Sequence, residues 1–202
     1  MIEIQYFGNI YYYLNLLKSK YINFDNRKWH KKGQSLNRMS ISGPNKVIHL
    51  SVPLEGGRAV KALVKDLKIA NRESWQRIHW RSIHDSYRKA PWFEEYAPEL
   101  ERLYRQNYKF LWDWNISTVN WSLKVMGLNK VILSESENFK EIDDSNNILS
   151  SPPKSAIFYP PYHQVFSDRH GFIENLSIID LIMNEGPEAL NYLSSIEVKD
   201  AA

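Results

Sequence analysis

The segment from residue 74 to residue 104 constrains the fold more than any other part of this 202-residue chain. It carries three of the seven Trp, two of the six His and a dense set of Arg. Apolar side chains recur through its first half at the three- and four-residue spacing of a helix. Pro91 interrupts the pattern, because the residue before a proline resists the α region. We therefore predict two helices that meet at residues 90–91, with His79 beside the apolar side of the first helix.

The N-terminal part of the chain predicts strands joined by a helix and by a turn. Residues 2–5, 9–18 and 21–24 have the patterns of a strand, a helix and a strand, and a parallel pair of this kind is joined by a right-handed crossover. A turn rich in Ser, Gly, Pro and Asn separates the apolar stretches 39–41 and 47–52, which predicts a hairpin.

The fold class predicted from these patterns is α/β: a single domain with a mixed β-sheet flanked by helices, containing an N-terminal β-α-β unit plus a hairpin. Pro98 is expected in the first turn of its helix, where its missing N–H costs nothing. We expect the domain to cover residues 1–196. A polar, flexible insertion is expected at 135–155, because few apolar residues are available there to form a core, and a tail at 197–202.

Composition excludes several classes of protein. The chain has no Cys, which excludes disulfides, thiol catalysis and thiolate metal sites. No apolar run reaches the roughly 20 residues that a membrane helix needs. The N-terminal stretch lacks the basic start and the small-residue cleavage site of a signal peptide. We therefore expect a cytoplasmic protein with no membrane span.

Charge is divided unevenly along the chain. Residues 1–110 hold 20 Lys and Arg against 10 Asp and Glu, a balance of +10, whereas residues 111–202 hold 6 against 13, a balance of −7. A basic half suits phosphate, a nucleotide or nucleic acid. It equally suits a basic half that packs beside an acidic one, and the sequence leaves both interpretations open.

Common catalytic signatures are missing from the sequence. His79 and His84 are five residues apart, which misses the same-face spacing of a metal-binding pair. Neither the nucleophile elbow G-x-S-x-G nor a Gly-rich phosphate loop is present. We expect no metal, and the residues identify no cofactor.

Three places are candidates for ligand contact, each with a structural alternative. His79 is either a packing residue or a catalytic one. Arg38, after Asn37, offers a guanidinium fork that matches phosphate or carboxylate, or else the two residues form a solvent-exposed pair at the start of a strand. Asp180 would need a partner if it were buried, and Arg38 or His79 would serve. Its segment, from Asn175 onward, otherwise only caps a helix and closes the core.

Four segments of the chain resemble the WbqC-like protein family. They are Gln5-Tyr6-Phe7 (the family's opening Q-P-x-Y-F-P-x-x-G-Y), Lys31-Lys32-Gly33 with Asn37-Arg38 (K-K-G-x-R-N-R), His79 with Tyr87 and Lys89-Ala90-Pro91 (H-x-x-x-I-x-x-x-Y-x-K-A-P-x-F), and Asn175-Leu176-Ser177 with Asn184-Glu185-Gly186 (its closing segment). The chain lacks the proline after Gln5 and the proline after Phe7. It is also short and polar at 134–155, where many members carry a helix and a Gly-rich segment.

The resemblance implies a transferase of surface-polysaccharide (O-antigen) biosynthesis, because members of the family occur in such gene clusters. It further implies a glycine or aminoacyl transferase that acts on an amino sugar, with a sugar nucleotide or a lipid-linked sugar as partner. His79 would be the general base, for which an unperturbed pKa near 6.5 is suitable, and Asp25 a second catalytic residue. The expected substrate-binding residues are Gln5, Tyr6, Lys32, Asn37, Arg38, Tyr87, Gln164 and Asp180.

Two other functions fit the same sequence. One is a non-catalytic polyanion or nucleic-acid binding protein that uses the basic half, although nucleic acid is not the partner that the resemblance implies. The other is an assembly partner in a polysaccharide-synthesis complex. The sequence does not indicate an oligomeric state. The transferase interpretation depends on one spatial expectation: Arg38 and His79 should converge on a shared hollow beside the first strand, at the carboxyl ends of the first two strands.

Overall fold

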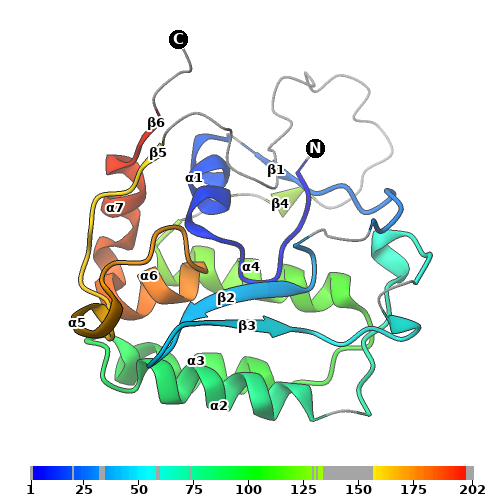
Figure 1. The fold of residues 1–202 in the computed structure, drawn as a ribbon. Helices are drawn as coiled ribbons and strands as arrows, with labels where there is room; N and C mark the ends of the chain where they lie inside the picture. Colours follow the sequence, from blue (N-terminus) through cyan, green and yellow to red (C-terminus); the bar gives the residue numbers. More distant parts are fainter. Residues whose placement is uncertain are drawn as a thin grey trace.

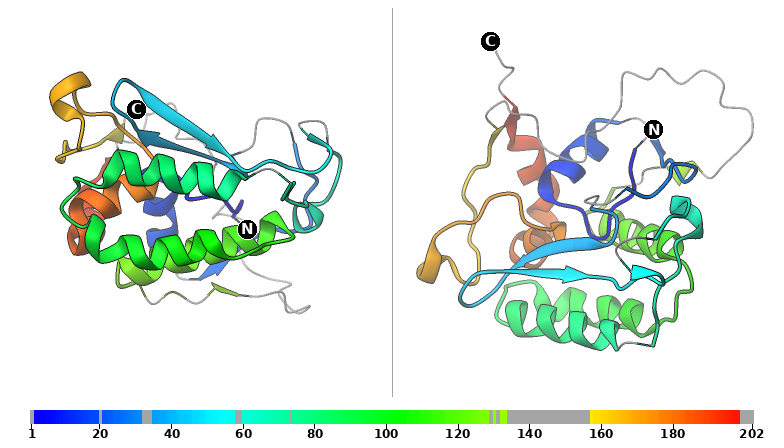
Figure 2. Two further views of the ribbon diagram at one scale, coloured as in Figure 1. Left: turned by 90° about the horizontal axis from the view of Figure 1, so that it is seen from below. Right: turned by 45° about the vertical axis from the view of Figure 1, so that its right-hand side comes forward.

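Two antiparallel helices, α2 (Trp75–Tyr87) and α3 (Phe93–Arg105), form the base of the molecule in Figure 1, and the left view of Figure 2 shows them side by side. A hairpin of β2 (Arg38–Ser42) and β3 (Val47–Ser51) lies on them. The structure is a computed structural model, and it describes residues 2–19, 21–31, 35–57, 60–72, 74–128, 130, 132–133 and 157–198.

The remaining elements surround this base. In chain order they are α1 (Ile10–Lys18), β1 (Ile22–Asn23), η2 (Val64–Asp66), α4 (Leu111–Val125), β4 (Ile132–Leu133), β5 (Ile157–Phe158), α5 (Ser167–His170), α6 (Ile178–Glu185), η4 (Gly186–Glu188), α7 (Ala189–Ser195) and β6 (Glu197–Val198). Asn9 caps the start of helix α1: its side chain accepts a hydrogen bond from the Tyr12 N–H at 2.9 Å, which satisfies one of the free donors of the first turn.

The predicted α/β class is confirmed, although the strands of the described residues pair into three two-stranded sheets and not into one mixed sheet. β1 pairs with β4 in parallel, whereas β2–β3 and β5–β6 are antiparallel. The predicted first strand is reduced to a single parallel bridge between Ile2 and Phe24. The strands β1, β4, β5 and β6 have only two residues each, so they offer few backbone groups for further pairing.

The two helices predicted for residues 74–104 are present, and a tight turn separates them. The Ala90 N–H donates to the Tyr87 carbonyl at 2.7 Å, and the Phe93 N–H donates to the Ala90 carbonyl at 3.2 Å. Pro98 was predicted to lie in the first turn of its helix. Helix α3 starts at Phe93, so Pro98 instead lies inside the helix.

An aromatic cluster joins the layers. Trp114 of α4 is fully buried. Its ring lies 5.1 to 6.3 Å, centroid to centroid, from those of Tyr6, Phe7, Trp75 and Tyr104. Aromatic rings bury large apolar areas and prefer tilted or edge-on contacts of this kind. The cluster therefore fixes the backbone at residues 6–7 against three helices.

Several sequence predictions fall at or beyond the limits of the described chain. The insertion expected at 135–155 lies outside the described residues. Residues 197–198, expected to begin a tail, instead form β6 against β5. Among the helices that the structure describes, none has both the length and the apolar character needed to cross a bilayer.

Candidate functional site

The outer face of the β2–β3 hairpin is polar. Register pairs Arg38 with Ser51 and Ser40 with His49. Side chains alternate between the two faces of a strand, so these four residues share one face, while apolar neighbours such as Met39 and Leu50 are buried on the other. Ser40 Oγ lies 2.9 Å from His49 Nδ1. The hairpin thus presents a guanidinium, an imidazole and two hydroxyls.

A cavity of about 420 Å³ lies against this polar face. Three segments far apart in the sequence line it. They are the N-terminal segment with Gln5, Phe7 and Asn9, the segment 35–51 with Ser35, Arg38, Met39, Ser40, His49 and Ser51, and the segment before α6 with Asn175 and Ser177. A concave site lined by a few convergent polar groups is where a small ligand most commonly binds.

Two lining residues have a backbone conformation that is rare outside glycine. Phe7 has a φ of 39° and Asn175 a φ of 54°. The segments that contain them are tied together: Asn175 Oδ1 accepts from the Tyr11 N–H at 2.9 Å, and Ser177 Oγ donates to the Phe7 carbonyl at 2.8 Å. Such conformations cost energy and cluster at functional sites, where surrounding contacts hold them.

Gly8 allows the close chain approach beside this strained pair. A Cβ at position 8 would lie 2.3 Å from a ring carbon of Tyr12. The Gly8 carbonyl accepts from the Ile178 N–H at 2.9 Å, which adds a further tie to the start of α6. The N-terminal turn and the start of α6 therefore form one rigid wall of the cavity.

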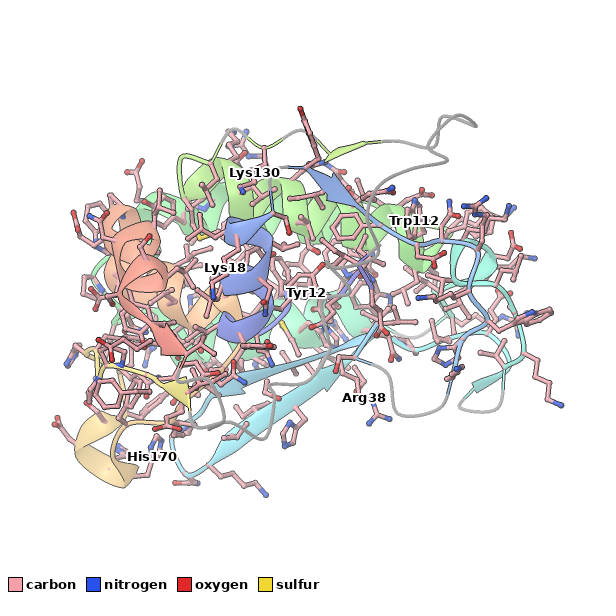
Figure 3. The ribbon with its side chains drawn as sticks, turned by 90° about the horizontal axis from the view of Figure 1, so that it is seen from above. Tyr12, Lys18, Arg38, Trp112, Lys130 and His170 are labelled. Atoms are coloured by element: carbon pink, nitrogen blue, oxygen red, sulfur yellow. The ribbon has the colours of Figure 1, made fainter. Side chains whose placement is uncertain are left out.

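The electrostatics of the lining favour an anion. Among the lining residues that the structure describes, Arg38 is the only formally charged one, and its exposed guanidinium has no ion pair within those described parts of the chain. In Figure 3 its side chain extends from the start of β2 away from the helices. Gln5, only 2% exposed, has an Nε2 amide donor without a hydrogen-bond partner. A buried amide without a partner is costly.

His79 lies behind the cavity wall and not in it. Its side chain is 4% exposed, and its Nδ1 lies 2.8 Å from the Tyr6 hydroxyl, which is itself 2.5 Å from the Tyr104 hydroxyl. Burial lowers the pKa of His79 to about 4, and a hydrogen bond with the Ser51 backbone acts in the opposite direction. The imidazole is therefore neutral at neutral pH and lacks the ordinary pKa expected of a general base. The expectation that Arg38 and His79 share a hollow is therefore wrong: Arg38 lines the cavity and His79 does not. Ser51 lies between them, because it pairs with Arg38 across the hairpin and its backbone contacts the His79 ring.

Three predicted binding residues meet in a second, buried cluster around Asp180. Its carboxylate accepts from the Tyr87 hydroxyl at 2.8 Å, from the Tyr162 hydroxyl at 2.5 Å and from Gln164 Nε2 at 2.9 Å. Burial raises the pKa of Asp180, and these three hydrogen bonds act in the opposite direction. The sequence predicted Arg38 or His79 as its partner, and that prediction was wrong: two tyrosines and a glutamine satisfy the carboxylate.

The other expected site residues that the structure describes do not line the cavity. Asp25 pairs with Lys28 at 3.4 Å and accepts from the Arg27 N–H at 3.1 Å, so it stabilises a turn. Asn37 Nδ2 donates to the Val52 carbonyl at 2.8 Å beside the hairpin. Lys32 lies outside the described residues. Among the expected residues that the structure describes, Gln5 and Arg38 alone line the cavity.

Sequence reasoning missed the contribution of His49, Ser51 and Ser40. The signal was present, because polar residues alternate with apolar ones in both hairpin strands. The residue opposite Arg38 depends on the register of the two strands. The register follows from the type of turn, and the sequence did not determine the turn type here. Within the described ranges, no group of three or more His, Asp or Glu is placed to hold a metal ion.

A protein-family model matches nearly the whole chain. A family model described as the WbqC-like protein family matches residues 5–151 and 154–192. No match was found among functionally curated proteins or among solved structures. The matched ranges contain all the described residues that line the cavity and the Asp180 cluster. The chain therefore belongs to the WbqC-like protein family.

Proposed function

We propose that this protein is a transferase of surface-polysaccharide biosynthesis that transfers an acyl group, such as glycyl, to the amine of a sugar carried by a nucleotide or a lipid. The observation that carries the proposal is the cavity beside the β2–β3 hairpin, where an unpaired guanidinium and an accessible imidazole share one polar face. The family name supports the pathway, since it is associated with O-antigen biosynthesis.

Arg38 would bind the anionic part of the substrate. Its fork matches the two oxygens of a phosphate or a carboxylate, and none of the described residues that line the cavity is an Asp or Glu that would compete with them. The unpartnered Nε2 of Gln5 would donate to a sugar hydroxyl or to a carbonyl of the substrate. Both groups lie on the same cavity, so one ligand could contact both.

His49 would be the general base. The amine nitrogen of the sugar attacks the carbonyl carbon of an activated acyl donor, a thioester or an ester. The new C–N bond forms, the bond from that carbon to sulfur or oxygen breaks, and His49 takes the proton from nitrogen and delivers it to the leaving group. Ser40 Oγ, 2.9 Å from Nδ1, would orient the ring and leave Nε2 for the substrate.

His79 and Tyr6 would be positioning residues in this proposal. His79 is buried between the Tyr6 hydroxyl and the backbone of Ser51, a lining residue. It would hold the end of β3 in place and would touch no substrate atom. This role replaces the catalytic one expected from the sequence.

Binding of an amine-bearing sugar nucleotide tests the proposal. UDP-glucosamine should raise the melting temperature of the wild-type protein. It should do the same for the control variant Lys46→Gln, which removes an exposed cation in the hairpin turn. Arg38→Gln should weaken the affinity at least about tenfold, because a charge-assisted hydrogen bond contributes about 1.5–3 kcal/mol. Equal affinity in Arg38→Gln and the wild type would show that this cavity is not the site.

A further inference from the structure

A basic surface lies outside the lining of the proposed transferase site. It consists of residues 27–31 and 61–68, here called the basic end. The His30 N–H donates to the Ala62 carbonyl at 2.9 Å, and the Lys65 N–H donates to the Asn26 carbonyl at 3.1 Å. Figure 1 shows the two segments together at the right-hand side of the molecule. Backbone hydrogen bonds therefore hold this surface in a fixed shape.

The basic end carries a large excess of positive charge. Its two segments contain six Lys and Arg and one Asp, which is Asp66. Lys28 is partly neutralised by Asp25 at 3.4 Å. Four exposed cations have no ion-pair partner in the described parts of the chain, namely Arg27, Lys61, Lys65 and Lys68. A fixed cluster of unpaired cations attracts a ligand that carries several negative charges.

Trp29 is the aromatic centre of the basic end. Its side chain is 62% exposed, the most exposed large hydrophobic residue among those described. It forms a β-bridge with Leu63. This pairing brings Lys61 and Lys65, which flank Leu63, beside the cations that flank Trp29. Most Trp residues bury their ring because of its large apolar area. The exposed ring of Trp29, surrounded by cations, is therefore accessible to a ligand.

We infer that the basic end binds single-stranded nucleic acid, with Trp29 stacking on a base and the surrounding cations contacting phosphates. Nonspecific single-strand sites combine an aromatic platform with a positively charged track in this way. An anionic membrane is the less suitable partner, because interfacial binding needs a buried apolar face. Within these two segments Trp29 is the only large hydrophobic side chain that is strongly exposed.

Titration of a fluorescein-labelled oligouridylate of roughly 16 nucleotides, followed by anisotropy, tests the inference. The logarithm of the association constant should fall linearly with the logarithm of salt concentration between about 50 and about 200 mM. Its slope should be about −3, because each single-strand phosphate contact contributes about −0.7 and four cations are unpaired. Lys61→Gln combined with Lys65→Gln should reduce the steepness of that slope by about 1.4.

One control variant separates the effect of this surface from that of net charge, and two variants of Trp29 test stacking. Lys46→Gln combined with Lys89→Gln removes the same charge from exposed positions in the hairpin turn and after α2, and it should leave the slope unchanged. Trp29→Ala should weaken binding about tenfold, whereas Trp29→Phe should retain most of it, since either ring can stack. All five substituted side chains, including Lys61 and Lys65, are exposed, so melting temperatures should stay near that of the wild type.

Three results would overturn the inference. Equal loss in the two double variants would show that binding follows overall charge. Unchanged affinity in Trp29→Ala would show that Trp29 does not stack on a base. Binding to phosphatidylglycerol vesicles that depends on Trp29, without binding to the oligouridylate, would assign the surface to a membrane. None of these results depends on transferase activity, so the proposed function is tested separately.

Discussion

Tyr6 and His79 share a buried hydrogen bond of 2.8 Å between the phenol oxygen and Nδ1, although 73 residues separate them in the sequence. The Tyr6 ring belongs to the aromatic cluster around Trp114, and the His79 ring stacks on Tyr6 with centroids 5.7 Å apart. This contact joins the N-terminal segment to α2 directly behind the cavity wall. The stability of the fold should therefore depend on the side chain at position 79.

His79→Ala should destabilise the protein by about 2–4 kcal/mol, because it leaves a cavity in the core and removes a hydrogen-bond partner from the Tyr6 hydroxyl. Chemical denaturation measures the change. His84→Ala, at an exposed position on the same helix, is the matched control and should change stability by less than about 0.5 kcal/mol. Equal and small effects in both variants would contradict a packing role for His79.

Stability should depend on pH through His79. Its pKa falls from 6.5 to about 4 on folding, so between these values the unfolded chain binds more protons than the folded one. The free energy of unfolding is therefore highest above pH 6.5, and it decreases by about 3 kcal/mol in total as the pH falls toward 4. Denaturation midpoints at several pH values should show this loss in the wild type. His79→Gln should lack that component, and an unchanged pH profile in the variant would refute the assignment.

Asp180→Ala should destabilise the protein by at least about 3 kcal/mol, because three buried donors lose their acceptor at once. Those donors come from Tyr87, Tyr162 and Gln164. Asp85→Ala removes a carboxylate exposed on α2 and should have little effect. The free energy of unfolding from urea titration measures both. A loss at Asp180 no larger than that at Asp85 would mean that the cluster contributes nothing to the fold.

Gly186→Ala should be more destabilising than Gly57→Ala by about 1–3 kcal/mol. Both glycines have positive φ, 55° and 65°, so both variants carry backbone strain. A Cβ at 186 would lie 2.3 Å from the ring of Trp92, whereas a Cβ at 57 would meet nothing within 4 Å. Thermal unfolding of the pair isolates the steric contribution. Equal shifts in melting temperature would show that Trp92 moves aside freely.

The elements that local patterns determine could be predicted from the sequence. Helical spacing and Pro91 predicted α2 and α3, and two apolar stretches around a turn predicted the β2–β3 hairpin. Their boundaries were less certain, as Pro98 inside α3 shows. The α/β class was predicted correctly, but among the described residues the strands pair into three small sheets and not into one. The extent of a sheet depends on which short strands find partners, and this information is not local.

The composition of the site was harder to predict than the fold. Gln5 and Arg38 do line one cavity, but His79 and Asp180 are enclosed by tyrosine hydroxyls from other segments. This chain has 12 Tyr, and the sequence does not indicate which of them a buried His or Asp will meet. A polar residue near a motif can equally be a ligand contact or a satisfied core residue, and only its burial distinguishes the two.

Transfer of a glycyl group from its thioester to UDP-glucosamine, followed by mass spectrometry of the sugar product, tests the proposed function most directly. His49→Gln should abolish product formation while the melting temperature stays that of the wild type, because the side chain is exposed on the cavity. His79→Gln should instead lower the melting temperature and retain transfer by the fraction that stays folded. Full transfer by His49→Gln, with transfer lost only in a fully folded His79→Gln, would contradict the account.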